Sequence, residues 1–157
     1  MACHALSLGI KEDEVIAAIL LHDTVEDDKN ISLKDLPVND QTKELVGLLT
    51  KKDIDDNLKT DMLDRYYAAI AQNPKAALIK CIDRCSNLST MAWGFDHDHQ
   101  RRYLVEVDKY YPELLKAVKE VPEYSNAYWL LKYQIDSMLD IYNEFLWSDS
   151  VIYWQKS

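Results

Sequence analysis

The scarcity of helix-breaking residues limits most strongly what this chain can fold into. Its 157 residues include only three glycines and four prolines, spread over long runs of good helix formers. Sheet proteins need such residues for their tight turns, whereas uninterrupted runs of helix formers favour helices. With 48% hydrophobic residues, the chain is long enough for one domain with a real core and short for two. The sequence therefore predicts a single, mostly helical domain.

Apolar residues that recur at intervals of three and four mark the expected helices. The helix at 12–22 is apolar on every side from Val15 to Leu21, so we expect other helices to surround it. The glycine at position 9 is typical of a helix C-terminus, and the pair Asn73-Pro74 is a strong helix start signal. We expect a charged loop at 94–100 and a kink or restart at Pro112. The polar stretch 30–40 should be a loop with a short helical turn, capped by Ser32. The expected helices cover the start of the chain up to Gly9, then 12–22, 41–52, 58–72, 74–92, about 101 onward, and 124–147, with 53–57 separating two of them.

The charge of the chain restricts its partners. With 27 acidic and 18 basic residues the net charge is −9, which opposes nonspecific binding to nucleic acid or to an anionic membrane. A polyanionic ligand would need a local basic patch or a metal ion. No apolar run approaches the roughly 20 residues of a membrane span, and no signal peptide is recognisable, so we expect a cytoplasmic protein. Cys3, Cys81 and Cys85 are interpreted as reduced core residues.

A polar stripe interrupts the apolar surface of the helix expected at 74–92. Its members lie three and four residues apart and therefore share one side of the helix. Taken alone, such a stripe is most simply the solvated face of an amphipathic helix. The stripe consists of Lys80, Asp83, Arg84 and Asn87.

A second polar cluster ends the first strongly apolar helix, in the segment AAILLHDTVEDDKN. His22 and Asp23 are adjacent, and both can reach one metal ion where the helix unwinds. Glu26 and Asp27 follow one turn later, where they could hold a water beside that ion. An isolated His-Asp pair is more often a capped helix end with a surface acid. The buried-looking Asp83 offers a distant third ligand, so together the residues indicate a metal site.

Two motifs in these segments resemble those of a known family. LLHDTVED at 20–27 and KCIDRCSN at 80–87 resemble ALLHDTVEDT and KLADRLHN of the HD-domain metal-dependent phosphohydrolases, specifically the RelA/SpoT-type (p)ppGpp hydrolases. The similarity extends more weakly over roughly residues 5–110. It implies an all-α HD-domain helical bundle over residues 1–157. The long aromatic-rich C-terminal helix at 124–147 carries no motif of the family.

The resemblance also implies an activity and its residues. A RelA/SpoT-type enzyme of the stringent response removes the 3′-diphosphate from guanosine tetra- or pentaphosphate, giving GDP or GTP and pyrophosphate. The ligand would be a small guanine nucleotide, and the cofactor a divalent ion, most simply Mn²⁺. By the resemblance, His22, Asp23 and Asp83 would ligate the metal, Glu26 and Asp27 would orient or deprotonate the attacking water, and Lys80, Arg84 and Asn87 would bind the substrate.

The chain departs from the family pattern in one important place. The family's metal site needs a further histidine, which would fall a few residues before Met1, and His4 lies about 12 Å from that place along the same helix. We therefore expect either a chain truncated at its N-terminus or a natural variant with an incomplete site, with weak or no metal binding and low activity. His4 should be an ordinary helix histidine, and His97 and His99 part of a polar loop. The alternatives are another HD phosphohydrolase, for instance one acting on nucleoside monophosphates, and a catalytically silent HD module that binds a nucleotide or a protein.

Overall fold

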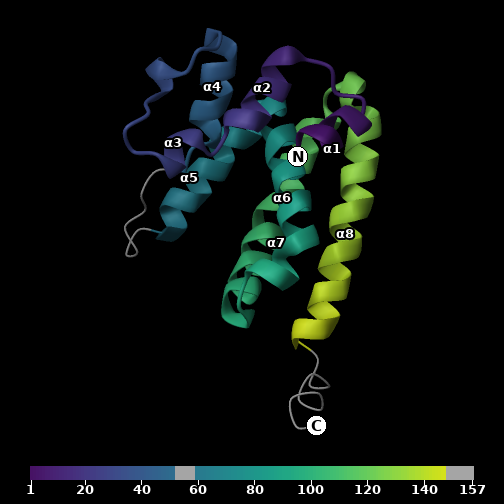
Figure 1. Ribbon diagram of the computed structural model, residues 1–157. Helices are drawn as coiled ribbons and strands as arrows, with labels where there is room; N and C mark the ends of the chain where they lie inside the picture. The colour runs from purple at the N-terminus through teal and green to yellow at the C-terminus, as the bar shows by residue number, and fades with distance from the viewer. Residues whose placement is uncertain (52–58, 148–157) are drawn as a thin grey trace.

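The computed structural model describes residues 1–51 and 59–147, and the regular structure within these ranges is helical (Figure 1). The expected all-α helical bundle is confirmed. None of the helices described is both long enough and apolar enough to cross a bilayer. The helices are α1 (Ala2–Ser7), α2 (Asp13–Leu21), α3 (Thr24–Asp27), α4 (Asp40–Leu49), α5 (Lys59–Ala71), α6 (Pro74–Gly94), α7 (His97–Lys119) and α8 (Ser125–Trp147), with 3-10 turns η1 (Leu33–Asp35) and η3 (Pro122–Tyr124).

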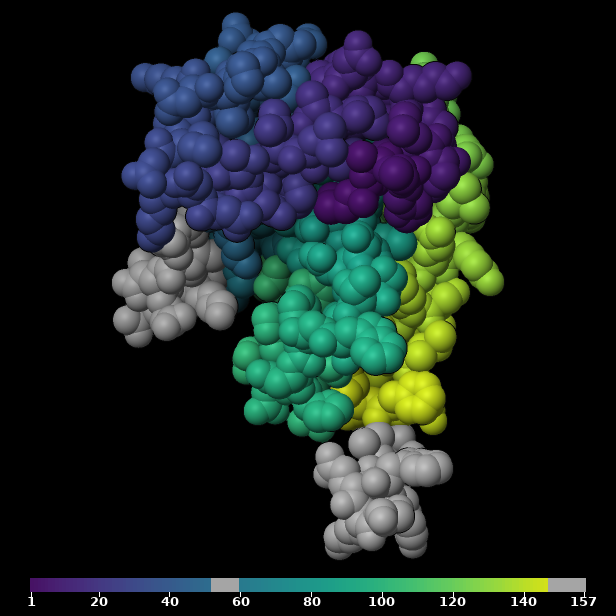
Figure 2. Space-filling model, in the orientation of Figure 1, coloured from purple at the N-terminus to yellow at the C-terminus, as the bar shows by residue number. Residues whose placement is uncertain are grey.

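Helix α6 forms the centre of the bundle. It contacts α7, α8, α5, α4 and α2, and Figure 1 shows α8 on one side of it and α4 and α5 on the other. Figure 2 shows the N-terminal segments as a continuous layer across one end of the helices that follow. A helix surrounded in this way must be apolar around most of its circumference, as the sequence of α6 is. Its fully buried apolar side chains include Leu78, Ile79, Ile82 and Leu88.

Local signals in the sequence position the ends of several elements. The side chain of Asn73 accepts hydrogen bonds from the backbone of Lys75 and Ala76, so the predicted start of α6 is confirmed. Gly9 has φ of +89°, a conformation that favours glycine and lets the chain turn after α1. Ser32 and Asp35 form a reciprocal capping pair at η1, as expected for a short helical turn. The separator expected at 53–57 lies outside the described residues.

Two expectations about the helices are wrong. Helix α2 is not buried on every side: Val15, Ala18 and Ile19 are buried, but Leu20 is 67% exposed. Helix α7 begins at His97 rather than near Arg101, because the side chain of Asp96 caps it by accepting from the backbone N–H of His99. The charged segment therefore starts a helix instead of forming a loop.

Pro112 neither ends nor restarts helix α7, which continues through it to Lys119. A proline in a helix cannot donate to the carbonyl four residues earlier, here that of Asp108. Both Asp108 and Pro112 are exposed, so water can solvate the carbonyl that loses its helical partner.

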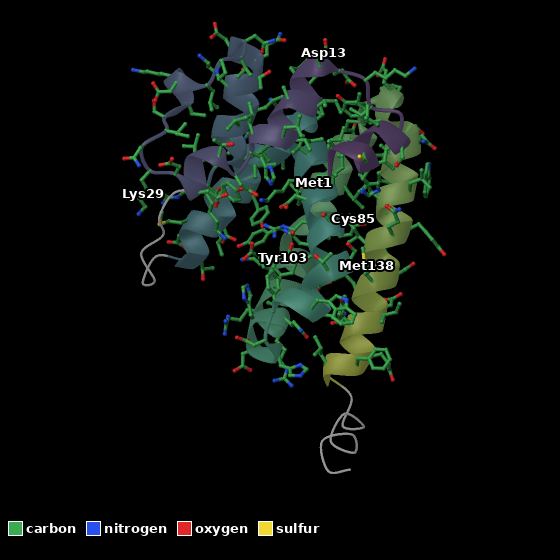
Figure 3. The ribbon with its side chains drawn as sticks, in the orientation of Figure 1. Met1, Asp13, Lys29, Cys85, Tyr103 and Met138 are labelled. Carbon is green, nitrogen blue, oxygen red and sulfur yellow. The ribbon has the colours of Figure 1, made fainter. Side chains whose placement is uncertain are left out.

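The cysteines divide between core and surface. Cys81 and Cys85 are buried free thiols, as expected, and Cys85 lies on the side of α6 that faces α8, where its Sγ is 3.5 Å from the side-chain oxygen of Gln134 (Figure 3). Burial raises the pKa of Cys85 to about 11 and raises that of Cys81 as well. Cys3 is exposed, so its assignment to the core is wrong. The two buried thiols are therefore protonated packing residues.

Candidate metal centre

The imidazole of His22 follows the end of α2 and lies near Asp83, in the middle of α6. Its Nε2 lies 2.9 Å from Oδ2 of Asp23 and 3.9 Å from Oδ1 of Asp83, 60 residues further along the chain than Asp23. Its Nδ1 lies 3.0 Å from the carbonyl oxygen of Ile19. In the neutral ring, donation from Nδ1 to that carbonyl leaves the lone pair on Nε2, which is the arrangement of most metal-ligating histidines.

Two carboxylates control the protonation of His22. Burial alone would lower its pKa, but the hydrogen bond and charge of Asp23, together with the charge of Asp83, raise the pKa above its usual value. The protonated ring therefore forms a stable ion-paired cluster with both acids. A divalent ion would occupy the same position by displacing that proton, so metal affinity at this site must increase with pH.

Asp83 is held in place by its own helix. Nδ2 of Asn87 donates to its Oδ1 at 2.9 Å, and Nζ of Lys80 lies 3.1 Å from its Oδ2. Burial would raise the pKa of Asp83, but the charges of Lys80 and Arg84 hold it below the usual range. The carboxylate is thus ionised and rigidly oriented toward His22.

The polar stripe of α6 is not a solvated face. Lys80 is 8% exposed, and Asp83 and Arg84 are each 6% exposed, so the simplest interpretation of the stripe is wrong. Helices α5 and α7 pack against α6, and the stripe forms buried ion pairs instead of contacts with bulk water. Buried charges are costly unless they are paired, and each of these is paired.

Arg84 belongs to a network that the sequence analysis missed. Its Nη2 donates to the hydroxyl of Tyr67 at 2.5 Å and lies 3.3 Å from Oε1 of Glu106. The Tyr67 hydroxyl donates to the same Glu106 oxygen at 2.6 Å, and Nζ of Lys51 lies 3.7 Å from it. Arg84 is therefore committed to α5 and α7. Glu106 could have been noticed as the one acid between the apolar positions Tyr103 and Val107 of α7.

The two acids expected to act on water lie differently. Glu26 is exposed, and its carboxylate accepts a hydrogen bond from the backbone N–H of Lys51. Burial and the charge of Arg84 lower the pKa of Lys80, whereas the charges of Asp83 and Glu26 oppose that effect. Glu26 is therefore close enough to interact electrostatically with Lys80. Asp27 is exposed, and within the described residues no hydrogen bond or ion pair joins its side chain to the other predicted site residues.

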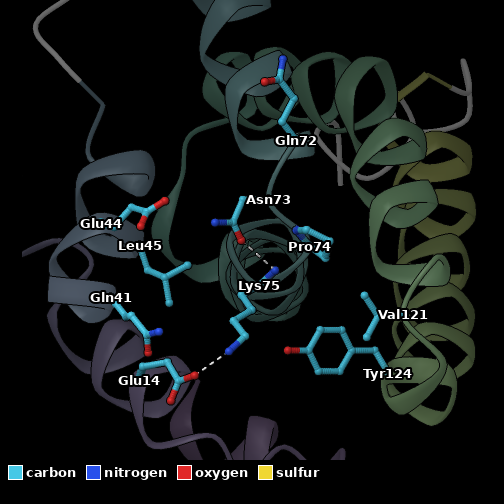
Figure 4. A pocket seen from close by; sticks show the side chains of 10 residues that line it. All are labelled: Glu14, Gln41, Glu44, Leu45, Gln72, Asn73, Pro74, Lys75, Val121 and Tyr124. Carbon is cyan, nitrogen blue, oxygen red and sulfur yellow. Dashed lines mark hydrogen bonds and ion pairs between the residues drawn. The ribbon is translucent and has the colours of Figure 1, made fainter. Parts of the chain in front are cut away.

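The remaining histidines lie elsewhere. Nε2 of His4 is 3.0 Å from the side-chain oxygen of Gln134, which fits its interpretation as an ordinary helix histidine. His99 stacks on Phe95 with ring centroids 4.0 Å apart, and His97 opens α7. A pocket of about 410 Å³ at the start of α6 contains an ion pair between Lys75 and Glu14 (Figure 4), but none of the predicted site residues lines it.

The donors around His22 do not form a complete metal-binding group. In the parts of the chain that the structure describes, no group of three or more His, Cys, Asp or Glu side chains has the arrangement of a metal-binding cluster. Both oxygens of Asp83 already contact Asn87 or Lys80. The chemistry of an imidazole and two carboxylates suits a divalent ion, and one of the carboxylates, Asp23, is 59% exposed and free to reorient.

Comparison with known protein families finds no match to this chain, and comparison with curated proteins finds no relative.

We expect Glu106→Gln to change the response of the protein to acid. Burial would raise the pKa of Glu106, but the Tyr67 hydroxyl and the charges of Arg84 and Lys51 lower it. A lowered pKa gives stability that is present above the unfolded-state value, about 4.3, and lost as the pH falls through the folded-state value. The wild-type free energy of unfolding should therefore fall as the pH drops below about 5, and that of Glu106→Gln should fall less. Urea denaturation at several pH values measures this, with the exposed Glu113→Gln as control; equal slopes for wild type and Glu106→Gln would contradict it.

Proposed function

We propose that this chain is a metal-dependent phosphohydrolase of the HD type, with guanosine 3′-diphosphate nucleotides as its substrates. The convergence of His22 with Asp23 and Asp83, at a buried junction of α2 and α6, carries the proposal. These residues fall in two separate motifs, so the two parts of the sequence that resemble the family meet in space. Guanosine tetra- or pentaphosphate would give GDP or GTP and pyrophosphate.

The residues of the site divide the chemistry between them. His22, Asp23 and Asp83 would hold the divalent ion, which when bound supplies polarisation of a phosphoryl oxygen and a lowered pKa for water. Asn87 and Lys80 position Asp83 through contacts at 2.9 and 3.1 Å. Glu26, exposed beside this cluster, would take the proton from the attacking water. Asp27 remains in the proposal as a second acid on the exposed side.

The cations of the site would act on the diphosphate at different distances. Lys80 is the closest cation to Asp83 and is available to a phosphoryl oxygen beside it. Asn87 can bind the nucleotide through the atoms that Asp83 does not use. Arg84 is paired with Glu106, so we propose that it acts through its charge and holds the wall of the site. The positive field of these side chains would then attract the anionic substrate locally, although the net charge of the chain is −9.

A second candidate is a catalytically silent module that binds a nucleotide or a protein. It is favoured by one observation, that both oxygens of Asp83 are engaged by Asn87 and Lys80 while the described residues contain no complete metal-binding group. A different HD phosphohydrolase, acting on nucleoside monophosphates, is less favoured because the acids at 26 and 27 are not general to HD proteins.

A product assay separates these candidates. The protein is incubated with Mn²⁺ and, in parallel, guanosine tetraphosphate, GDP and GMP, and the products are separated by anion-exchange chromatography. The proposal predicts GDP and pyrophosphate from the tetraphosphate and no pyrophosphate from GDP. Phosphate released only from GMP would instead identify a monophosphate hydrolase. Nucleotide binding without any product would identify a silent module.

A further inference from the structure

Two hollows lie along the C-terminal half of α4. One, of about 780 Å³, lies between the end of α3, η1 and α4; the other, of about 480 Å³, lies between α4 and α5. They share Gly47, Thr50 and Lys51. The two hollows together are called the α4 groove.

The floor of the α4 groove is apolar. Leu33 of η1 and Leu48 of α4 are half-buried and pack against the core, and the ring of Tyr66 adds an aromatic surface. Gly47 permits this arrangement, because a Cβ at that position would lie only 3.0 Å from Cδ1 of Leu33. The absence of a side chain there lets η1 approach α4 closely. Small-molecule sites are typically apolar hollows of several hundred Å³ with a few placed polar groups.

The rim of the groove carries an excess of positive charge. Among the residues that the structure describes, Lys29, Lys34, Lys51 and Arg65 line it together with one acid, Glu26. Lys51 is paired with Glu106, which does not line the groove. This excess occurs in a chain whose net charge is −9. Lys34 and Arg65 are exposed, and neither side chain has an acidic partner among the residues that the structure describes. Cations without acidic partners above an apolar floor attract an anion that also has an apolar part.

We propose that the α4 groove binds a small organic phosphate, with its phosphate group at Lys34 and Arg65 and its apolar or aromatic part on the floor beside Leu33 and Tyr66. Such a site shares Glu26, at its rim, with the residues proposed for hydrolysis, and its other lining residues lie outside that set. It is nevertheless connected to that set, because Lys51 donates its backbone N–H to Glu26 and Nζ of Lys80 lies 5.7 Å from the centroid of the Tyr66 ring. The negative charge of a bound phosphate would therefore act on the carboxylate of Glu26.

Titration calorimetry in a buffer with EDTA tests the groove without any contribution from a metal centre. The probes are phenyl phosphate, inorganic phosphate and phenol, which separate the charge from the ring. We expect phenyl phosphate to bind at one site, more tightly than either of the other two. The double variant Lys34→Glu with Arg65→Glu should weaken that binding by about tenfold or more, because like charges then oppose the phosphate. The matched control, Lys116→Glu with Lys119→Glu on α7, makes the same change of charge outside the groove and should stay within about twofold.

A further variant tests the floor independently of charge. Gly47→Ala should push Leu33 into the groove and weaken phenyl phosphate binding, while the circular dichroism spectrum of the protein stays unchanged. Three results would overturn the proposal: no binding of phenyl phosphate to the wild type, equal affinity for phenyl phosphate and inorganic phosphate, or equal losses in the two double variants. A failure to hydrolyse guanosine tetraphosphate, with groove binding intact, would refute the proposed hydrolase and leave the groove site standing.

Discussion

Replacing Asp83 by Asn is expected to lower the free energy of unfolding by about 3 kcal/mol, because removing one partner of a buried ion pair leaves the other uncompensated. The Asp83 side chain is 9% exposed, and it neutralises Lys80, itself 8% exposed. The field of its charge also reaches Arg84. Asparagine keeps the size of the side chain, so the loss reflects charge rather than packing. Chemical denaturation at pH 7 measures it.

A surface pair provides the matched control. Nζ of Lys109 lies 2.7 Å from Oδ1 of Asp64, but both side chains are 48% exposed, so water replaces the lost partner. Asp64→Asn should therefore change stability far less than Asp83→Asn. Equal losses in the two variants would show that the Asp83 cluster is not an electrostatic support of the fold.

Replacing Glu26 by Gln is expected to reduce the turnover of guanosine tetraphosphate by about 100-fold or more, if Glu26 accepts the proton from the attacking water. The amide keeps an oxygen that can accept from the backbone of Lys51, so the local structure should persist. The affinity for Mn²⁺ should change little, because the proposed ligands are untouched. Steady-state kinetics and a Mn²⁺ titration on the same preparations measure the two effects.

Asp28→Asn is the control for the Glu26 experiment, since Asp28 is another exposed acid of the same segment, and its side chain accepts hydrogen bonds from the backbone and side chain of Asn30. It should leave turnover nearly unchanged. If Glu26→Gln weakened Mn²⁺ binding as much as it slowed turnover, Glu26 would be acting on the ion rather than on the water.

The parts of the fold that local chemistry determines could be predicted from the sequence. Asn73 caps α6 through its own side chain, and Gly9 adopts the backbone angle that the end of α1 requires. The start of α7 at His97 also depends on a local cap, Asp96. This cap was not predicted, because the many charged residues of the segment favoured a loop. The approach of His22 to Asp83 was expected from the order of two motifs, not from any property of either helix alone.

The parts that depend on packing between distant segments could not be predicted. Helices α5 and α7 pack over the stripe of α6 and exclude bulk water from it. The periodic pattern within α6 does not specify which segments will cover that face. For the same reason Leu20 was expected inside and is 67% exposed. The partners of Arg84, which are Tyr67 and Glu106, come from two other helices, so no spacing in the sequence connects them.

We propose that His22, Asp23 and Asp83 form a site for a divalent ion. It is tested most directly by titrating Mn²⁺, up to millimolar concentrations, into the metal-free wild type and Asp23→Asn, and following the unfolding temperature of each. Asp23 is 59% exposed, so its variant should fold normally. We expect Mn²⁺ to raise the unfolding temperature of the wild type in a saturable way. The effect should increase with pH, because the ion displaces the proton of His22, and it should be much smaller in the variant. Identical responses of the two proteins over that range would contradict it.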